Sequence, residues 1–215
     1  MDLLAVEKDL HQKGYRKIAC IDEVGRGCLC GPVTAAAVIL PEDLLLEGVN
    51  DSKKLSPKKR EAYFGLIQKE ALAIGIGEVS HEEIDQINIK NATKKAMFLA
   101  IENLQTSEGE KVVPDYVLVD AETIETDLPQ EGIIQGDGKV QGIAAASIIA
   151  KVTRDRQLVE LSHRYPEYGL EKHKGYGTKV HREALKQFGP TPIHRKSFLK
   201  KMVLPTPKVG ESHGS

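Results

Sequence analysis

The sequence predicts an α/β fold in which a central mixed β-sheet is flanked by helices. Short apolar segments typical of buried strands occur in two settings: as a pair joined by a glycine-rich turn, and separated by helical stretches. A pair joined by a turn gives antiparallel neighbours, whereas strands separated by helices pair in parallel, so one sheet should contain both kinds of pairing. The 215 residues are enough for one sizeable core.

Four segments are predicted as strands because they are apolar and bounded by turn residues. They are Arg16–Asp22, Val33–Leu40, Leu72–Val79 and Asp115–Asp120. The Gly-rich turn between the first two predicts a hairpin, and residues 41–55 are expected to form a loop.

Helices are predicted where a cap signal or an apolar face occurs. Ser56 followed by Pro57 begins a helix that runs to about Ala71. Ser80–Glu83 is a capping-box pattern that opens a short helix, and a separate helix follows at Asn91–Leu104. The other predicted helices are Leu4–Lys13, Ile143–His163 and Lys179–Phe188. The first half of the helix at 143–163 is small and apolar, which predicts close packing against the sheet.

Charge is distributed unevenly along the chain. Residues 1–150 hold 16 Lys and Arg against 25 Asp and Glu, whereas residues 151–201 hold 13 against 5. An acidic body with a basic C-terminal quarter suits a protein that holds metal ions at one end and phosphates at the other. Ordinary helix-surface lysines are the alternative interpretation. His163, His173 and His181 are expected at the surface, without zinc.

The remaining composition favours a cytoplasmic protein that does not cross a membrane. No apolar run reaches the roughly 18 residues of a transmembrane helix, and the acids near the start are unlike a signal peptide. Cys20, Cys28 and Cys30 lie close together with no second cluster, so we expect reduced packing residues rather than a zinc site.

Carboxylates end two apolar strands and occupy a third flexible position. Asp22 and Glu23 follow one strand, Asp120 ends another, and Asp137 lies between two glycines. Adjacent strand residues point to opposite faces, so Asp22 and Glu23 can share one site only where the strand ends or bends. Mg²⁺ prefers oxygen ligands and commonly takes one or two carboxylates, so four acids suit two ions about 4 Å apart. Helix caps and turn acids are the alternative interpretation.

Gly25–Gly27 follows a strand, which raises the question of a dinucleotide site. That fingerprint needs G-x-G-x-x-G leading into a helix. Here the third glycine is Gly31, one residue too late, and an apolar strand follows. Two acids before the loop would also repel a pyrophosphate. The glycines are better suited to close backbone approach to a substrate, with Arg26 beside them.

The chain resembles type 2 ribonuclease H (ribonuclease HII) in seven blocks that occur in family order and span roughly residues 15–200. They are Ile21–Gly27 (IDEVGRG), Asn50–Leu55 (NDSKKL), Val119–Asp120, Gly136–Asp137, Ala144–Asp155 (AAASIIAKVTRD), His173–Thr178 (HKGYGT) and Gly189–Phe198 (GPTPIHRKSF). One heptad would be suggestive, but seven ordered blocks are highly specific.

The resemblance implies a ribonuclease H-like α/β fold with a small C-terminal helical extension. The metal-binding and catalytic tetrad would be Asp22, Glu23, Asp120 and Asp137. The loop that reads the ribonucleotide 2′-hydroxyl would be Gly25, Arg26 and Gly27, with Tyr176 as its partner. We expect a catalytic domain at 1–163, a substrate-binding extension at 164–205 and a disordered tail at 206–215.

Some positions depart from the family pattern. Cys28 stands where proline is frequent, Cys30 where a small residue is usual, and Ala121 where glycine is common. Glu122 adds an acid near Asp120; a metal ligand is one interpretation, and a solvated loop acid is the preferred one. The two cysteines are modest apolar replacements that do not touch the implied ligands.

The implied enzyme is an endoribonuclease of RNA–DNA hybrids that also cuts on the 5′ side of single ribonucleotides in duplex DNA. Two Mg²⁺ or Mn²⁺ ions would activate water and stabilise the leaving 3′-oxygen, giving 3′-hydroxyl and 5′-phosphate ends. A monomer is expected. Candidate phosphate contacts are Lys53, Lys54, Ser147, Lys151, Arg154, Lys174, Thr178, His194 and Arg195.

Two rival hypotheses remain. A two-metal nuclease or strand-transfer enzyme acting on DNA would keep the acids but would not need Gly25–Gly27 with Tyr176. A non-catalytic nucleic-acid binder would have no reason to present four acids to phosphates. Cleavage of a substrate that carries one ribonucleotide distinguishes the ribonuclease from the DNA-cutting enzyme. Metal-dependent cleavage excludes the non-catalytic binder.

Overall fold

The computed structural model describes residues 2–49 and 55–202, with a five-stranded sheet in the order β3-β2-β1-β4-β5 at its centre. The strands are β1 (Ile18–Val24), β2 (Val33–Ile39), β3 (Ala73–Val79), β4 (Tyr116–Asp120) and β5 (Gln130–Ile133). β1 and β2 form the predicted hairpin and β3 continues it antiparallel, whereas β4 and β5 run parallel to β1. The mixed sheet is therefore confirmed. β5 was not predicted as a strand because its sequence, QEGI, is polar and only partly buried.

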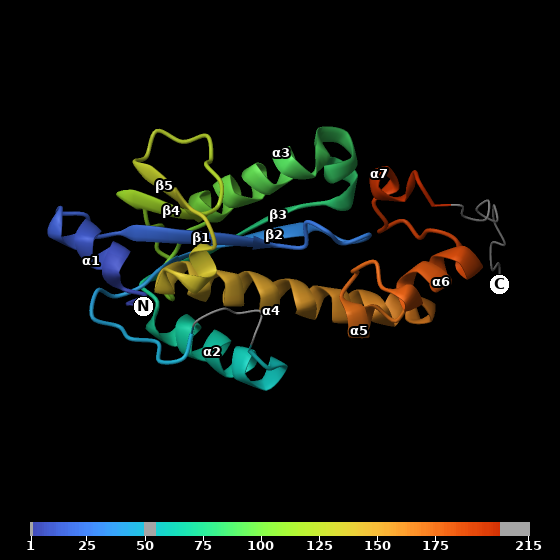
Figure 1. Cartoon of the computed structure of the whole chain (residues 1–215), viewed down its shortest axis with the longest axis horizontal. Helices are drawn as coiled ribbons and strands as arrows, with labels where there is room; N and C mark the ends of the chain where they lie inside the picture. Colours follow the sequence, from blue (N-terminus) through green and yellow to red (C-terminus); the bar gives the residue numbers. More distant parts are fainter. Residues whose placement is uncertain (1, 50–54, 203–215) are drawn as a thin grey trace.

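Helices cover both faces of this sheet (Figure 1). They are α1 (Ala5–Gln12), α2 (Pro57–Glu70), α3 (His81–Glu102), α4 (Gln141–Arg164), α5 (Leu170–His173), α6 (Lys179–Phe188) and α7 (Lys196–Leu199), with 3₁₀ turns η1 (Gly136–Gly138) and η2 (Pro166–Tyr168). α3 lies on one face, and α4 with α2 on the other. None of the helices in the described part of the chain has the length and apolar character of a membrane span.

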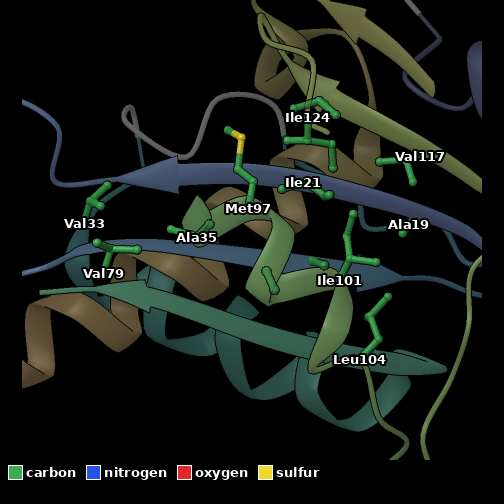
Figure 2. Packing of buried hydrophobic residues seen from close by; sticks show 14 of the residues in the cluster. Ala19, Ile21, Val33, Ala35, Val79, Met97, Ile101, Leu104, Val117 and Ile124 are labelled. Atoms are coloured by element: carbon green, nitrogen blue, oxygen red, sulfur yellow. The ribbon is translucent and has the colours of Figure 1, made fainter. Parts of the chain in front are cut away.

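The core is divided by the sheet because side chains alternate along each strand. Ala19 and Ile21 of β1 face α3, where Met97 and Ile101 pack against them (Figure 2). Asp22, one residue further, faces the opposite side, toward α4. The alternation thus places an acid on the α4 face at the end of β1.

α3 contains the two helices that the sequence predicted, joined without a loop. Asn88 has a φ of 67° and a ψ of 163°, which breaks the helical backbone. Its side-chain oxygen accepts hydrogen bonds from the backbone N–H groups of Lys90 and Asn91, 3.0 and 3.1 Å away. Asn88 therefore caps the second half, as Asn does at helix starts.

α4 packs closely on β1, as its small residues predicted. A Cβ added to Gly142 would lie 2.4 Å from Sγ of Cys20, so only glycine fits at this contact. Ala144, Ala145 and Ala146 follow and are fully buried. This close approach brings the next residue, Ser147, to the end of β1.

The helices after α4 pack against the connection between β1 and β2. Leu29 and Cys30 from that connection, Leu158 of α4 and Leu185 of α6 belong to one buried cluster. A residue on the C-terminal segment can therefore reach the Gly25–Gly27 loop, although it lies about 150 positions away in sequence.

Candidate active site at the ends of β1 and β4

Asp22 and Glu23 occupy the end of β1, where the strand meets the loop at Gly25. Asp22 is 3% exposed and accepts a hydrogen bond from the side chain of Ser147 on α4. Its Oδ1 also accepts a bond from the backbone N–H of Glu23 at 2.7 Å. Gly25 then turns the chain with a φ of 94°, a conformation that favours glycine.

Asp120 lies beside this pair because β4 runs parallel to β1. The register pairs Ile21 with Val119, so the next residues on the two strands, Asp22 and Asp120, end at the same edge of the sheet. Asp137 lies in η1, directly after β5, and is 7% exposed. The carboxyl groups of Asp22, Glu23 and Asp120 therefore gather at one edge of the sheet, and the hydrogen bond from the N–H of Gly136 to Asp120 holds the turn that carries Asp137 beside them.

Electrostatics within this group favour a bound cation. Burial raises the pKa of Asp22 well above its ordinary value, and the negative charges of Glu23 and Asp120 add to the effect. Burial also raises the pKa of Glu23, while Arg26, whose Nη1 lies 3.3 Å from Oε1 of Glu23, offsets part of it. Buried acids that repel one another are costly unless a positive ion lies between them.

The donor set fits magnesium or manganese. All four side chains offer hard oxygen ligands, the kind that Mg²⁺ binds through a few carboxylates. Across the described residues, no three acidic side chains bring their oxygens within 4.8 Å of one another. No three of these carboxylates therefore form a ready-made coordination sphere for a single ion.

The Gly25–Gly27 loop, Tyr176 and one of the acids, Glu23, line a single cavity. This cavity, of about 230 Å³, is lined by Glu23, Val24, Gly25, Arg26, Gly27, Arg60, Ser147, Lys151 and Tyr176. Cys28 pairs with Tyr176 as an isolated antiparallel bridge, and the N–H of Leu29 donates to the carbonyl of Gly175 at 2.8 Å. The backbone thereby fixes Tyr176 opposite the loop that precedes Cys28.

Two backbone donors of this loop are available to a ligand. Arg26 and Gly27 are exposed, and their N–H groups donate to no acceptor among the described residues. Tyr176 is 40% exposed, and Nζ of Lys151 lies 5.7 Å from the centre of its ring. A sugar hydroxyl in the cavity could thus meet amide donors on one side and an aromatic ring on the other.

Three predicted phosphate contacts are contradicted by burial. Arg154, His194 and Arg195 are at most 1% exposed. The guanidinium groups of both arginines donate to backbone carbonyls, and the His194 ring is held by His181 and Thr191. These side chains cannot reach a phosphate without unfolding their surroundings.

The other predicted contacts differ in position. Ser147 and Lys151 line the cavity, and Lys151 forms an ion pair with Asp155, its Nζ 2.7 Å from Oδ1. Lys174 is half-buried, and Nζ donates to the carbonyl of Glu171. Thr178 is exposed and caps α6 through its hydroxyl. Lys53 and Lys54 lie outside the described residues.

The expectation that His181 is a surface residue is wrong, since its side chain is fully buried. Nδ1 of His181 donates to the carbonyl of Tyr176 at 3.0 Å, and its Nε2 therefore accepts from Nε2 of His194, also 3.0 Å away. Nδ1 of His194 in turn accepts from the N–H of Thr191. Burial lowers the pKa of both histidines to about 4, so both rings are neutral at pH 7.

A soft ligand does accompany His181, which the sequence did not reveal. Sγ of Cys30 and the ring nitrogens of His181 and His194 all lie within 4.8 Å of one another. The two Nε2 atoms are already bonded to each other, and burial raises the pKa of the Cys30 thiol to about 12. The two histidines thus form a hydrogen-bond network that joins α6 to Tyr176 and to the segment before α7, and the Cys30 thiol lies beside it.

Arg60 is a cavity residue that the sequence reasoning missed. It lies one turn into α2, and its Nη2 donates to the carbonyl of Leu55 at 3.0 Å. The available signal was its place in the first turn of the helix that follows the Asn50–Leu55 block. Such helix starts lie close to whatever the preceding loop binds.

The fold and the acidic edge together define a metal-dependent nuclease with a ribonuclease H-like architecture. The family model described as Ribonuclease HII matches residues 19–201. Ribonuclease HII of Alkaliphilus metalliredigens is 56% identical over 203 residues, which cover 94% of this chain and 100% of the relative. Ribonuclease HII of Bacillus subtilis is 54% identical over 198 residues, 92% of this chain and 75% of the relative.

Two solved structures of ribonucleases have a similar fold. Ribonuclease H2 from Pyrococcus horikoshii matches with a TM-score of 0.69 and 28% identity, over 84% of this chain and 93% of that one. Ribonuclease HII from Archaeoglobus fulgidus, in a complex with PCNA, matches with a TM-score of 0.70 and 30% identity over the same shares. The chain belongs to the ribonuclease HII family, and it is a metal-dependent endoribonuclease of RNA–DNA hybrids.

Proposed function

We propose that this enzyme, besides cutting the RNA strand of hybrids, cuts on the 5′ side of single ribonucleotides embedded in duplex DNA. The products are a 3′-hydroxyl and a 5′-phosphate, and two Mg²⁺ or Mn²⁺ ions serve the reaction. All proposed site residues come from one chain, so a monomer suffices for the reaction. The expected location is the cytoplasm.

The observation that carries this proposal is the shared cavity of about 230 Å³. Its lining includes Glu23, Arg26, Gly27 and Tyr176. A space of this size admits one sugar rather than a run of several. One 2′-hydroxyl beside the acids is therefore enough to satisfy the loop, and an extended RNA strand is not required.

Discrimination between RNA and DNA rests on the 2′-hydroxyl. The N–H groups of Arg26 and Gly27 donate to that hydroxyl. The ring of Tyr176 packs on the neighbouring deoxyribose, whose bare 2′ carbon tolerates the contact, and Lys151 beside the ring supplies a positive charge for the backbone. A deoxyribonucleotide at the cut site would leave both amides unpaired, which costs free energy.

Asp22, Glu23, Asp120 and Asp137 would hold the ions. When bound, the ions supply an activated water and stabilise the charge on the leaving 3′-oxygen. Ser147 orients the carboxylate of Asp22 through its hydrogen bond, and Arg26 holds Glu23 at the mouth of the cavity. These contacts pre-set the ligand oxygens before an ion arrives.

The test is cleavage of a labelled DNA duplex that carries one ribonucleotide, with an all-DNA duplex and an RNA–DNA hybrid as the matched substrates. We expect one cut, 5′ of the ribonucleotide, with Mg²⁺ or Mn²⁺, and none with chelator. Cleavage of the hybrid alone would disprove the proposal. Cleavage of the all-DNA duplex would favour a DNA nuclease instead.

A further inference from the structure

Two buried arginines lie directly behind the Gly25–Gly27 loop. Arg154 on α4 and Arg195 before α7 are both 0% exposed. No carboxylate among the described residues forms an ion pair with either of them. A buried cation without an acid is costly, so its hydrogen bonds must compensate.

All the hydrogen bonds that the Arg195 side chain donates go to backbone carbonyls of residues 26–32. Its Nη1 donates to the carbonyl of Arg26, its Nε to that of Gly31, and its Nη2 to that of Pro32, each at 3.0 Å. The guanidinium also lies 5.1 Å from the ring centre of Phe198. Burial lowers the pKa of Arg195 to about 10, so the side chain is charged at pH 7.

Arg154 joins the same segment to the segment that carries Tyr176. Its Nε donates to the carbonyl of Pro32 at 2.9 Å, its Nη2 to that of Cys30 at 3.0 Å, and its Nη1 to that of Lys174 at 2.9 Å. The side chain also underlies the turn, because a Cβ on Gly25 would lie 2.3 Å from Nε of Arg154. One fork thus sets the spacing between the loop and Tyr176.

A hydrogen bond that fixes a backbone carbonyl also fixes the direction of the next N–H group. In a trans peptide the C=O and the following N–H point in opposite directions. Arg195 holds the carbonyl of Arg26, so the N–H of Gly27 points away from Arg195. The carbonyl of Gly25 likewise accepts from the N–H of Cys28 at 3.4 Å, which directs the N–H of Arg26 outward.

We propose that Arg154 and Arg195 are positioning residues that hold the two loop amides and Tyr176 in the geometry that recognises a ribonucleotide. They touch neither substrate nor metal ions and act through the backbone of residues 26–32 and 174. This inference rests on the proposed function, since it assigns a consequence to the loop that reads the 2′-hydroxyl.

The test measures discrimination rather than activity alone. Arg195→Lys and Arg154→Lys are made in an Asp120→Asn background that binds without cutting, and fluorescence anisotropy gives Kd for a one-ribonucleotide duplex and for the all-DNA duplex. Lysine keeps the charge but cannot form the three-armed fork. Discrimination is the Kd for the all-DNA duplex divided by the Kd for the one-ribonucleotide duplex. We expect this ratio to fall about tenfold, which corresponds to one misplaced hydrogen bond to a buried group. The Kd for the all-DNA duplex should stay unchanged.

Two further variants separate positioning from stability. Leu104→Ala, fully buried against the other face of the sheet, should lower the melting temperature yet keep the ratio. Phe198→Leu removes the aromatic ring that packs against Arg195 and leaves the arginine in place. It should give a smaller fall in the ratio, and it remains informative if a lysine variant fails to fold.

The outcomes are distinct. An unchanged ratio in Arg195→Lys, Arg154→Lys and Phe198→Leu would overturn the positioning role, as would a fall in Leu104→Ala equal to theirs. If the Asp120→Asn reference itself bound both duplexes equally, the proposed reading of the 2′-hydroxyl would fail, and the positioning role with it.

Discussion

The carboxylate of Asp120 accepts a hydrogen bond from the backbone N–H of Gly136, with 2.7 Å between Oδ1 and N. This bond ties the end of β4 to the 3₁₀ turn that carries Asp137. One acid of the site therefore positions the backbone beside another. Space is limited here, because a Cβ on Gly136 would lie 3.3 Å from the same oxygen and 2.6 Å from Cδ1 of Ile143.

Asp120→Asn should abolish cleavage while preserving the fold. The amide oxygen can still accept from Gly136, but the side chain loses the charge that a metal ion needs. We expect kcat to fall by roughly a thousandfold or more, since metal ions contribute several kcal/mol to such reactions. The melting temperature should equal or exceed that of the wild type, because one of several mutually repelling acids becomes neutral.

Glu122→Gln is the matched control for this variant. Glu122 lies two residues beyond Asp120, and its Oε2 is 3.9 Å from Nζ of Lys94. We expect kcat to stay within about twofold, as for substitutions away from a reacting centre. Wild-type turnover by Asp120→Asn, or inactivity of Glu122→Gln, would contradict the assignment of the acids.

Gly25→Ala and Gly27→Ala should differ sharply in stability although they are two residues apart. At Gly25 the φ of 94° and the 2.3 Å approach to Nε of Arg154 leave no room for a methyl group. At Gly27 an added Cβ meets nothing within 4 Å. Gly25→Ala should lower the unfolding free energy by about 2 kcal/mol or more, and Gly27→Ala by less than about 0.5 kcal/mol.

Thermal unfolding without substrate measures this difference. Equal melting temperatures for the two variants would refute the steric argument. Both variants should lose cleavage of the one-ribonucleotide duplex, because Gly27 lies in the cavity that receives the sugar.

Metal binding should be visible in stability as well as in activity. An ion that binds only the folded state stabilises it by about 2.7 kcal/mol at a hundred times its Kd, which corresponds to roughly 5–10 °C for a chain of this size. Mn²⁺ or Mg²⁺ should raise the melting temperature of the wild type, and EDTA should reverse the rise. The rise should be absent from the Asp22→Asn, Asp120→Asn double variant, and an equal rise there would place the ions elsewhere.

Much of this fold could be predicted because its signals are local. The Ser56–Pro57 cap, the capping box at Ser80 and the apolar strands all act within a few residues, and the structure confirms the elements that they predicted. The acids at the strand ends could be predicted for the same reason, since parallel strands bring their carboxyl ends to one edge of a sheet.

The buried basic residues could not be predicted, because their partners are distant in sequence. Arg154 bonds to Pro32, 122 positions away, and Arg195 to Arg26, 169 positions away. From the sequence alone, a basic residue in a basic segment is predicted to contact phosphate. A guanidinium can equally satisfy backbone carbonyls, and only the packing of the C-terminal segment on the β1–β2 connection decides between the two.

Glu7 supplies a pH-dependent test of the packing between α1 and the start of α4. Its side chain is buried, its Oε1 lies 3.8 Å from Sγ of Cys20, and its Oε2 has no hydrogen-bond partner among the described residues. Burial raises the pKa of Glu7 from 4.5 to about 7. The folded state therefore prefers the protonated carboxyl more strongly than the unfolded chain does.

The sign of the effect follows from this difference. Below pH 4.5 the carboxyl is protonated in both states, and its contribution to stability is fully present. As pH rises from 4.5 through 7 the unfolded chain releases the proton first, so stability is lost, by about 3 kcal/mol in all. Glu7→Gln removes this titration and should melt several degrees above the wild type at pH 8.5, yet within about 1 °C of it at pH 4. Glu183→Gln, whose side chain is 59% exposed, is the control and should show no such dependence; a Glu7→Gln difference that is equal at both pH values would show that the carboxyl titrates in solvent-like surroundings.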